Sequence, residues 1–277
     1  MSRGDLTEAE WRVLKGLLPI EASNRGRGRR PEANRAIING ILWRLRCGTP
    51  WRDVPPKYGN WNTIYRRFRR WSDAGVWEAV SVTLAEIMAD SGHYSIDSTT
   101  VRAHVSAAGR KRGTHRRALG RSRGGFTSKL HRLADGRGRP LAFHLTVGEA
   151  ADCKAYNALI AMPEQAPKAL LADKGYDADA IRADLAERGI QVVIPGRSNR
   201  RVKIEHDREL YKQRNQIERF FGHLKINRAI ATRYDQLAES FLSMVHIATA
   251  RYWLKFAHAG IENMVGAAGI EPATPPV

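Results

Sequence analysis

The segment from Tyr211 to Lys225 carries ionisable side chains at a spacing that could do chemistry. If the segment is one helix, a rotation of about 100° per residue places Tyr211, Arg214, Glu218 and Lys225 within about 60° of one another. A phenol, a carboxylate and two cations then share one stripe, beside an apolar stripe that packs on a core. This arrangement suits a site for a metal ion and a phosphodiester. The simpler alternative is an ion pair between Arg214 and Glu218 that serves helix stability.

Two further carboxylates lie in segments that we expect to be strands. Asp97 falls inside an apolar, β-branched stretch, where aspartate is disfavoured. Asp173 ends a short buried stretch that begins at Ala169, and functional groups gather at the carboxyl ends of strands in open α/β sheets. Each residue alone has an ordinary explanation, as a strand-turn cap for Asp97, a turn residue for Asp173 and a helix ion pair for Glu218.

Together, Asp97, Asp173 and Glu218 predict a catalytic metal site. Three carboxylates at one point would repel one another and raise each other's pKa, and divalent cations remove that conflict. Carboxylate oxygens suit Mg²⁺ or Mn²⁺. Two such ions, about 3.5–4 Å apart, clamp the attacking and leaving oxygens of a phosphodiester, so we expect two ions per active site.

The composition points to a polyanionic partner. The 277 residues include 46 Lys and Arg against 28 Asp and Glu, a formal net charge of +18. This excess favours nucleic acid, and an anionic membrane surface is the weaker alternative because no lipidation signal is present. Cys47 and Cys153 make neither a disulfide framework nor a zinc motif, and the N-terminus is polar, so we expect a cytoplasmic protein.

Residues 1–90 are predicted to be a helical, DNA-binding region. Thr7 and Glu10 have the spacing of a capping box, and a later helix is expected to stop at Gly48. The helix expected over 61–71 has one apolar face, and arginines cover the rest of its surface. These are Arg66, Arg67, Arg69 and Arg70. The helix could enter a major groove, or it could be a surface helix with excess charge.

From about residue 94 the pattern changes to β. The elements follow the order βββαβαβα, with strands near 94–105, 129–134, 140–147, 169–173 and 191–195. We expect a mixed five-stranded sheet with helices on both faces, the element order of a ribonuclease H-like domain. Its predicted bounds are 91–259, and residues 260–277 have no periodicity and predict a disordered tail.

A second basic segment links the first two strands, where a tight hairpin would suffice. It contains Arg110, Lys111, Arg112, Arg116 and Arg117. A long cationic insertion beside Asp97 is typical of a segment that follows a phosphate backbone. The alternative is a solvated loop.

These motifs resemble those of the DDE transposases of bacterial insertion sequences. The spacing Tyr211, two residues, Arg214, three residues, Glu218, six residues, Lys225 matches a signature of one large group, and the contexts of Asp97 and Asp173 also match. The resemblance implies that Asp97, Asp173 and Glu218 are the metal-binding catalytic triad. It also implies that Tyr211, Arg214 and Lys225 contact DNA or organise the site. The stretch between Asp173 and Glu218 leaves no room for the β-rich insertion of some relatives.

The resulting hypothesis is a transposase that cuts DNA at the ends of a mobile element and joins them to target DNA. Its expected partners are both kinds of DNA and, in the synaptic complex, at least one further copy of itself, with no membrane partner. Association with the bacterial nucleoid is the expected location. The alternatives are a stand-alone ribonuclease H-like DNA nuclease, and a non-catalytic DNA-binding repressor or domesticated copy.

Overall fold

The structure is a computed structural model that describes residues 4–19, 33–89, 92–108, 118–122 and 124–267. Within these ranges, the side chains of Ala108, Glu218 and residues 256–267 are not described. The basic residues that we expect to follow the DNA backbone lie outside the described residues. They are Arg110, Lys111, Arg112, Arg116 and Arg117. Their role stays a prediction.

The N-terminal part is a group of helices, as the sequence predicts. Their bounds are α1 Glu8–Leu17, α2 Asn34–Cys47, the 3₁₀ turns η1 Trp51–Asp53 and η2 Pro56–Tyr58, α3 Trp61–Asp73 and α4 Val76–Met88. Thr7 and Glu10 form the expected capping box, in which each side chain accepts a hydrogen bond from the other residue's backbone N–H. Gly48 follows α2 in the left-handed conformation, at φ 69°, and the helix ends there as expected.

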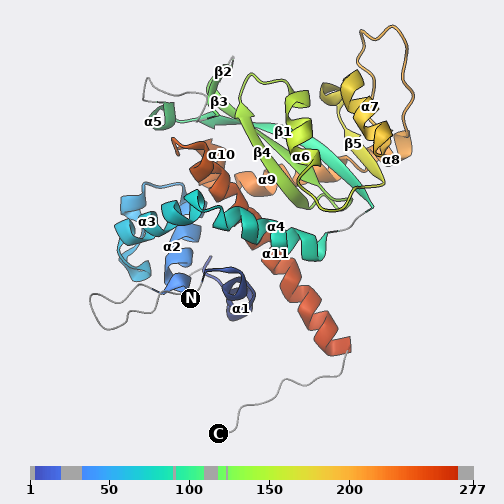
Figure 1. The fold of residues 1–277 in the computed structure, drawn as a ribbon. Coiled ribbons are helices and arrows are strands. Elements are labelled where there is room, and N and C mark those ends of the chain that lie inside the picture. The colour runs from blue at the N-terminus through green and yellow to red at the C-terminus, as the bar shows by residue number, and fades with distance from the viewer. Residues whose placement is uncertain (1–3, 20–32, 90–91, 109–117, 123, 268–277) are drawn as a thin grey trace.

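Within the described residues, seven strands form one mixed sheet (Figure 1). Their bounds are β1 His93–Ala103, β2 Gly120–Ser122, β3 Gly125–Ala134, β4 Pro140–Val147, β5 Ala169–Ala172, β6 Gln191–Val193 and β7 Thr232–Arg233. The five predicted strands lie in the order β4-β3-β1-β5-β6, with β3 antiparallel to β1 and β4, and β5 parallel to β1 and β6. The sequence did not predict β2 and β7, because segments of three and two residues carry no periodicity.

Helices cover both faces of the sheet. Their bounds are α5 Val105–Ala108, η4 Asp152–Ala155, α6 Tyr156–Ile160, η5 Lys174–Tyr176, α7 Asp179–Glu187, α8 Arg208–Lys212, α9 Asn215–Lys225, α10 Arg228–Ala231 and α11 Ala238–Ala267. Asp97 pairs with Arg132 across β1 and β3, so both side chains point to one face, where Arg132 bonds α9. The opposite face carries Ser98 and His131 and packs against α6.

The prediction of one continuous helix from Tyr211 to Lys225 is wrong. Helix α8 starts at Asp207, whose side chain accepts a hydrogen bond from the Leu210 N–H, and α9 starts only at Asn215. Between them the backbone tightens, because the N–H groups of Gln213 and Arg214 each donate to a carbonyl three residues earlier. The uniform rotation that placed Tyr211 on the Glu218 stripe is therefore interrupted.

The predicted disordered tail over residues 260–277 stays a prediction. Helix α11 continues as a helix to Ala267, and residues 268–277 lie outside the described residues. No described helix combines the length and the apolar content needed to cross a membrane.

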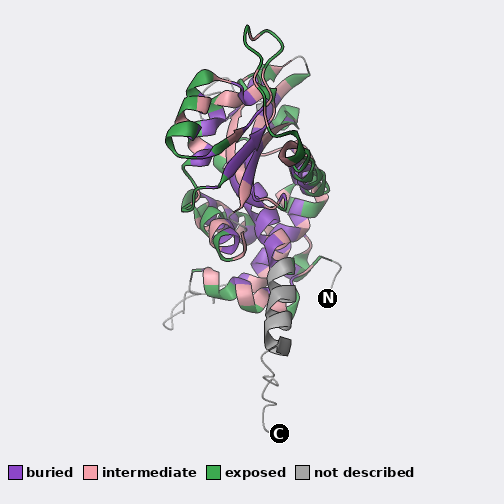
Figure 2. Ribbon diagram, turned by 90° about the vertical axis from the view of Figure 1, so that its right-hand side faces the viewer, coloured by how far each residue is buried: buried purple, intermediate pink, exposed green. Residues whose placement is uncertain are grey.

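Helix α11 joins the N-terminal helices to the sheet (Figure 1). It packs against α1, α3 and α4 and also against β4. Leu14 and Ile41 of the N-terminal helices belong to the same buried apolar cluster as Leu133 and Leu170 of the sheet. Figure 2 shows this buried interior running from the sheet into the helices below it. The domain boundary expected near residue 90 therefore stays a prediction, because the core is continuous across it.

A glycine in the turn between β3 and β4 allows α9 to pack closely on the sheet. Gly138 has φ 73°, and a Cβ built there would lie 2.6 Å from the Gln216 carbonyl oxygen of α9. Gly138→Ala should therefore lower the free energy of unfolding in two ways. The positive φ is unfavourable for alanine, and the clash with the Gln216 carbonyl should cost about 1–3 kcal/mol more. The matched control is Gly189→Ala, which has φ 68° and nothing within 4 Å of the new Cβ. Equal losses for the two variants in urea unfolding would contradict this close packing.

Candidate active site

The two aspartates of the predicted triad follow each other on neighbouring parallel strands. Ile96 of β1 pairs with Ala172 of β5, so Asp97 and Asp173 are the next residues on adjoining strands. Asp173 lies one residue beyond β5 and caps the η5 turn by accepting a hydrogen bond of 2.8 Å from the Gly175 N–H. The structure therefore brings these two predicted site residues together.

Asp97 is held by polar contacts in a largely enclosed position. Its Oδ1 accepts a hydrogen bond of 2.8 Å from the Ser98 N–H, and its Oδ2 lies 3.1 Å from a guanidinium nitrogen of Arg214. Burial raises the pKa of the Asp97 carboxyl, and the nearby Asp173 carboxylate adds to the rise, against the opposing effects of Ser98 and Arg214. An uncompensated negative charge at this position is thus disfavoured, and a cation would stabilise it.

The other signature residues lie on α8 and α9. Arg214 precedes α9 and reaches β1 at Asp97, whereas Lys225 ends α9 and donates a hydrogen bond of 2.8 Å to Thr99 Oγ1. Tyr211 of α8 packs on the buried cluster formed by β5 and β6. The Arg214 guanidinium carbon lies over the Tyr211 ring, 5.8 Å from the ring centroid. Helix α9 includes Glu218, whose side chain lies outside the described part of the structure.

The donor chemistry of the site fits a hard divalent cation. Asp97 and Asp173 offer carboxylate oxygens from adjoining strands, which are ligands that Mg²⁺ and Mn²⁺ prefer. Among the described side chains, no group of three or more His, Cys, Asp or Glu residues could hold a metal ion. A third ligand would have to come from a side chain such as that of Glu218, so the complete triad stays a prediction.

A buried arginine fixes α9 against the strand that carries Asp97. Arg132 lies directly opposite Asp97 on β3 and donates a hydrogen bond of 2.6 Å to the Ile217 carbonyl of α9. Its guanidinium also lies 4.6 Å and 4.8 Å from the ring centroids of Phe220 and Phe221. Burial lowers the pKa of Arg132 to about 9, and Asp97 is the leading charge that opposes this shift.

A further carboxylate, that of Asp152, lies on the opposite face of the sheet from Asp97 and contacts the neighbouring residue Ser98. Asp152 Oδ1 accepts a hydrogen bond of 2.5 Å from the Ser98 hydroxyl and lies 3.3 Å from Lys129 Nζ. A Cβ on Gly175 would lie 2.9 Å from Asp173 Oδ1 and 3.1 Å from Asp152 Oδ2. Asp152 therefore lies next to both segments that carry the predicted catalytic aspartates, Asp97 and Asp173.

The polar groups behind Asp152 form a neutral, buried layer. His131 lies with one ring nitrogen 2.8 Å from Thr146 Oγ1 and the other 3.4 Å from the Tyr176 hydroxyl. Burial lowers the pKa of His131 to about 4, so the imidazole is neutral near pH 7. Sequence spacing could not reveal this layer, because its members come from three separate elements, β3, β4 and η5.

Two of the four predicted DNA-binding arginines of α3 are exposed, and two are bonded within the protein. Arg66 and Arg70 face solvent. Arg67 bonds Asn34 of α2 and lies over the Trp71 ring, and Arg69 bonds Ser240 of α11 and pairs with Asp73 at 2.9 Å. The basic surface available on α3 is therefore narrower than the sequence suggests.

Two family descriptions together match most of the chain. "Transposase DDE domain" matches residues 89–253, and "Putative transposase of IS4/5 family" matches residues 6–81. The chain belongs to the DDE transposase family. The resemblance noted in the sequence is thus confirmed, and Asp97 of β1 and Asp173 after β5 lie inside the matched region.

Individual relatives and one solved structure agree with this assignment. A "Putative transposase for insertion sequence element IS6501" of Brucella ovis is 36% identical over 131 residues, covering 47% of this chain and 100% of the relative. The corresponding protein of element IS402 from Burkholderia cepacia is 33% identical over 122 residues, covering 40% of this chain and 56% of the relative. The piggyBac transposase in its synaptic complex with hairpin DNA matches 96% of this chain and 73% of its own, with a TM-score of 0.54 and 10% identity. That likeness confirms the ribonuclease H-like fold.

If Asp152 positions the two catalytic aspartates, its charge should matter to DNA cleavage without being a ligand. Asp152→Asn keeps the size but leaves Lys129 without its carboxylate partner, and cleavage should fall about 10- to 100-fold. The matched control is Asp184→Asn, because Asp184 also accepts a hydrogen bond from a hydroxyl, that of Tyr156 at 2.6 Å. Cleavage of plasmid DNA and thermal melting are measured for both variants. If the Asp152→Asn protein has a lower melting temperature and regains normal cleavage when assayed at a lower temperature, Asp152 has a purely structural role.

Proposed function

We propose that this transposase cuts DNA at the ends of a mobile element and joins those ends to target DNA. The observation that carries the proposal is the placement of Asp97, inside β1, beside Asp173, directly after β5, under a helix that contains Glu218. The family assignment covers all three residues.

Both proposed steps are in-line substitutions at phosphorus. In the first, water attacks the phosphodiester at an element end, the bond from phosphorus to the 3′ oxygen breaks, and a 3′-hydroxyl and a 5′-phosphate result. In the second, that 3′-hydroxyl attacks a target phosphodiester and displaces the target's own 3′ oxygen. Neither step needs a covalent bond between DNA and protein.

Asp97, Asp173 and Glu218 are the residues proposed to hold two Mg²⁺ or Mn²⁺ ions. When bound, such ions supply Lewis acidity and lower the pKa of bound water. The chain's own contribution is to present two carboxylates at a rigid sheet edge. The raised pKa of Asp97 makes its charged form depend on a nearby cation, which favours metal binding at this position.

The cations of the signature are proposed to position the DNA. Arg214 reaches β1 at Asp97 and Lys225 reaches it two residues later at Thr99, so both lie along the strand that carries the catalytic aspartate. Their charges would offset that of a phosphate near the carboxylates. Tyr211, beneath the Arg214 guanidinium, would keep that side chain in place.

Further basic surfaces are proposed to hold the rest of the DNA. The exposed arginines of α3 are the described candidates, and the basic segment between β1 and β2 is the other. Bringing two element ends together in one complex requires at least two copies of the chain. The two alternative functions give different products with a labelled element end and a plasmid. A nuclease without strand transfer would cut the DNA but not join the labelled end to the plasmid. A non-catalytic DNA-binding protein would leave both DNAs uncut.

The decisive test removes one metal-binding charge at a time. Asp97→Asn, Asp173→Asn and Glu218→Gln should each reduce cleavage of DNA that carries the element ends by about a thousandfold or more, because each loses a ligand charge at nearly constant volume. Binding of the same DNA should stay close to that of the unchanged protein. Cleavage and strand transfer are followed on gels with Mg²⁺ and with chelator. Near-normal cleavage by any one variant would remove that residue from the triad, and cutting without joining in the unchanged protein would favour a nuclease.

The exposed arginines of α3 should contribute to DNA affinity through phosphate charge. Arg66→Ala and Arg70→Ala should each weaken binding to element-end DNA and lower the slope of log affinity against log salt by about 1. The control is Arg12→Ala on α1, whose side chain is 80% exposed. Fluorescence anisotropy between low and physiological salt gives both quantities. If the α3 variants match the Arg12 variant, α3 is a surface helix and not part of the DNA-binding site.

A further inference from the structure

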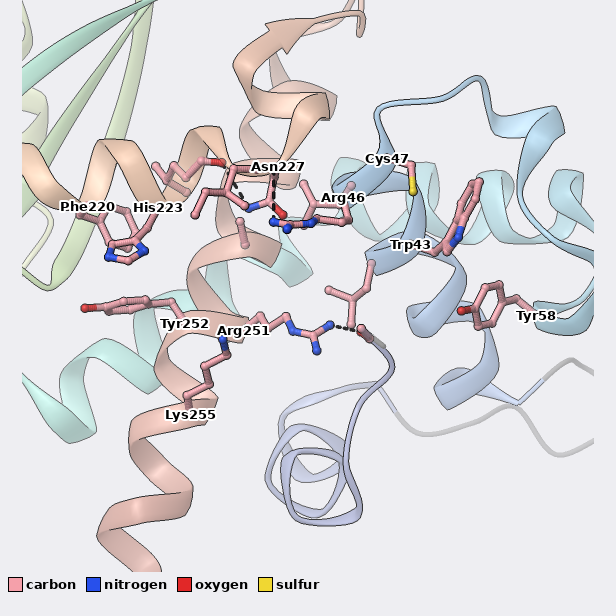
Figure 3. A pocket seen from close by; sticks show the side chains of 16 residues that line it. Trp43, Arg46, Cys47, Tyr58, Phe220, His223, Asn227, Arg251, Tyr252 and Lys255 are labelled. Atoms are coloured by element: carbon pink, nitrogen blue, oxygen red, sulfur yellow. Dashed lines mark hydrogen bonds between the residues drawn. The ribbon is translucent and has the colours of Figure 1, made fainter. Parts of the chain in front are cut away.

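A cavity of about 580 Å³ lies where the N-terminal helices meet α9 and α11. Figure 3 shows its walls: Phe220 and His223 come from α9, Tyr252 and Arg251 from α11, and Trp43 from α2. It is separate from the carboxylate site, because neither Asp97 nor Asp173 lines it. Its volume falls within the range of pockets that hold small organic ligands.

The charge of this cavity is positive and uncompensated by lining acids. Arg46, Arg251 and Lys255 line it, and none of the described lining residues is Asp or Glu. Arg46 donates to the Ile226 carbonyl at 3.3 Å, and Arg251 donates to the carbonyls of Gly4 and Asp5. Backbone carbonyls fix the direction of these guanidinium groups but leave their net charge, so the cavity favours an anion.

The walls of the same cavity are aromatic. Phe220 and Tyr252 meet edge to face, with ring centroids 4.9 Å apart, and Trp43 and Tyr58 lie on the other side in Figure 3. The Tyr58 hydroxyl donates to the carboxylate of Asp5 at 2.7 Å, which fixes the position of this ring. A ligand with a flat ring and a negative group would match both the walls and the charges.

We propose that this cavity binds an unpaired nucleotide of a DNA strand, with its base against the aromatic walls and its phosphate at Lys255 and Arg251. A nucleotide is the common anion that carries an aromatic ring, and stacking on aromatic side chains tolerates any base. The source is DNA and not a free nucleotide, because the chain carries a net charge of +18 and the cavity adjoins the helix that holds Glu218. This inference rests on the proposed function for the presence of DNA, but not on cleavage.

The test uses the full chain in buffer with chelator and no metal, so that cleavage plays no part. The probe is a 5′-phosphorylated DNA tetranucleotide that contains one 5-iodo-2′-deoxyuridine, measured by fluorescence anisotropy. Tyr252→Leu should weaken its binding about tenfold through loss of stacking, and Tyr252→Phe should restore it. Lys255→Glu should weaken binding and lower the salt slope by about 0.7 or more. The control Lys15→Glu makes the same charge change on an exposed residue of α1 outside the cavity.

Photocrosslinking then locates the base. Cross-links to peptides that contain Trp43, Tyr58 or Tyr252 support the proposal, and cross-links confined to other peptides overturn it. Unchanged affinity in Tyr252→Leu and Lys255→Glu variants that melt like the unchanged protein also overturns it. Free dAMP and a tetraglutamate peptide are tested as competitors. If either binds at these residues as tightly as the DNA tetranucleotide, the natural ligand is of another class and the proposal is overturned. An Asp97→Asn protein that no longer cleaves but still binds the probe through Tyr252 would separate this site from the catalytic proposal.

Discussion

The parallel pairing of β1 with β5 is the constraint on which the rest of the site depends. It brings Asp97 of β1 next to Asp173, the residue that follows β5, and the Asp173 carboxylate adds to the cost of ionising Asp97. On one face of the sheet, Arg214 offsets part of that cost by placing a positive charge beside Asp97. On the other face, Asp152 accepts a hydrogen bond from the hydroxyl of Ser98, the residue next to Asp97. The two acids therefore lie close together in a position where a cation would stabilise both.

The same strand pair also controls where α9 lies. Arg132 is placed opposite Asp97 by the antiparallel register of β1 and β3, and its buried guanidinium bonds the Ile217 carbonyl between two phenylalanine rings. A buried guanidinium without hydrogen-bond partners is destabilising. Displacement of α9 would therefore raise the free energy of the folded state, because it would break the hydrogen bond from Arg132 to Ile217. Gly138 adds a steric limit at the start of the helix. The backbone of Glu218 is therefore fixed relative to Asp97 by a charge and by a close packing contact.

Much of this could be read from the sequence, and the failures have physical causes. The sequence predicts Asp97 because an acid is disfavoured inside an apolar strand, and Asp173 because it ends a short buried strand. It predicts the five main strands because their segments are rich in strand-forming residues. The break between α8 and α9 was missed because helical residue types continue through Gln213, while the Asp207 cap and the tightened turn that separate the helices depend on hydrogen bonds. Asp152 was missed because Ser98 and Lys129 come near it only through strand register. Glu218's place in the triad stays a prediction.

The contacts around the end of α9 link the N-terminal helices to the active-site side of the sheet. Arg46 of α2 bonds the Ile226 carbonyl directly after α9, and a Cβ on Gly48 would lie 2.8 Å from Arg228 Cβ. Arg44 forms a buried ion pair with Asp235 at 3.1 Å. Arg44, Arg46 and Gly48, at the C-terminal end of α2, thus hold the segment that follows α9. If the N-terminal helices bind DNA as predicted, that DNA and the position of α9 would be coupled through these contacts, because α2 cannot move without disturbing them.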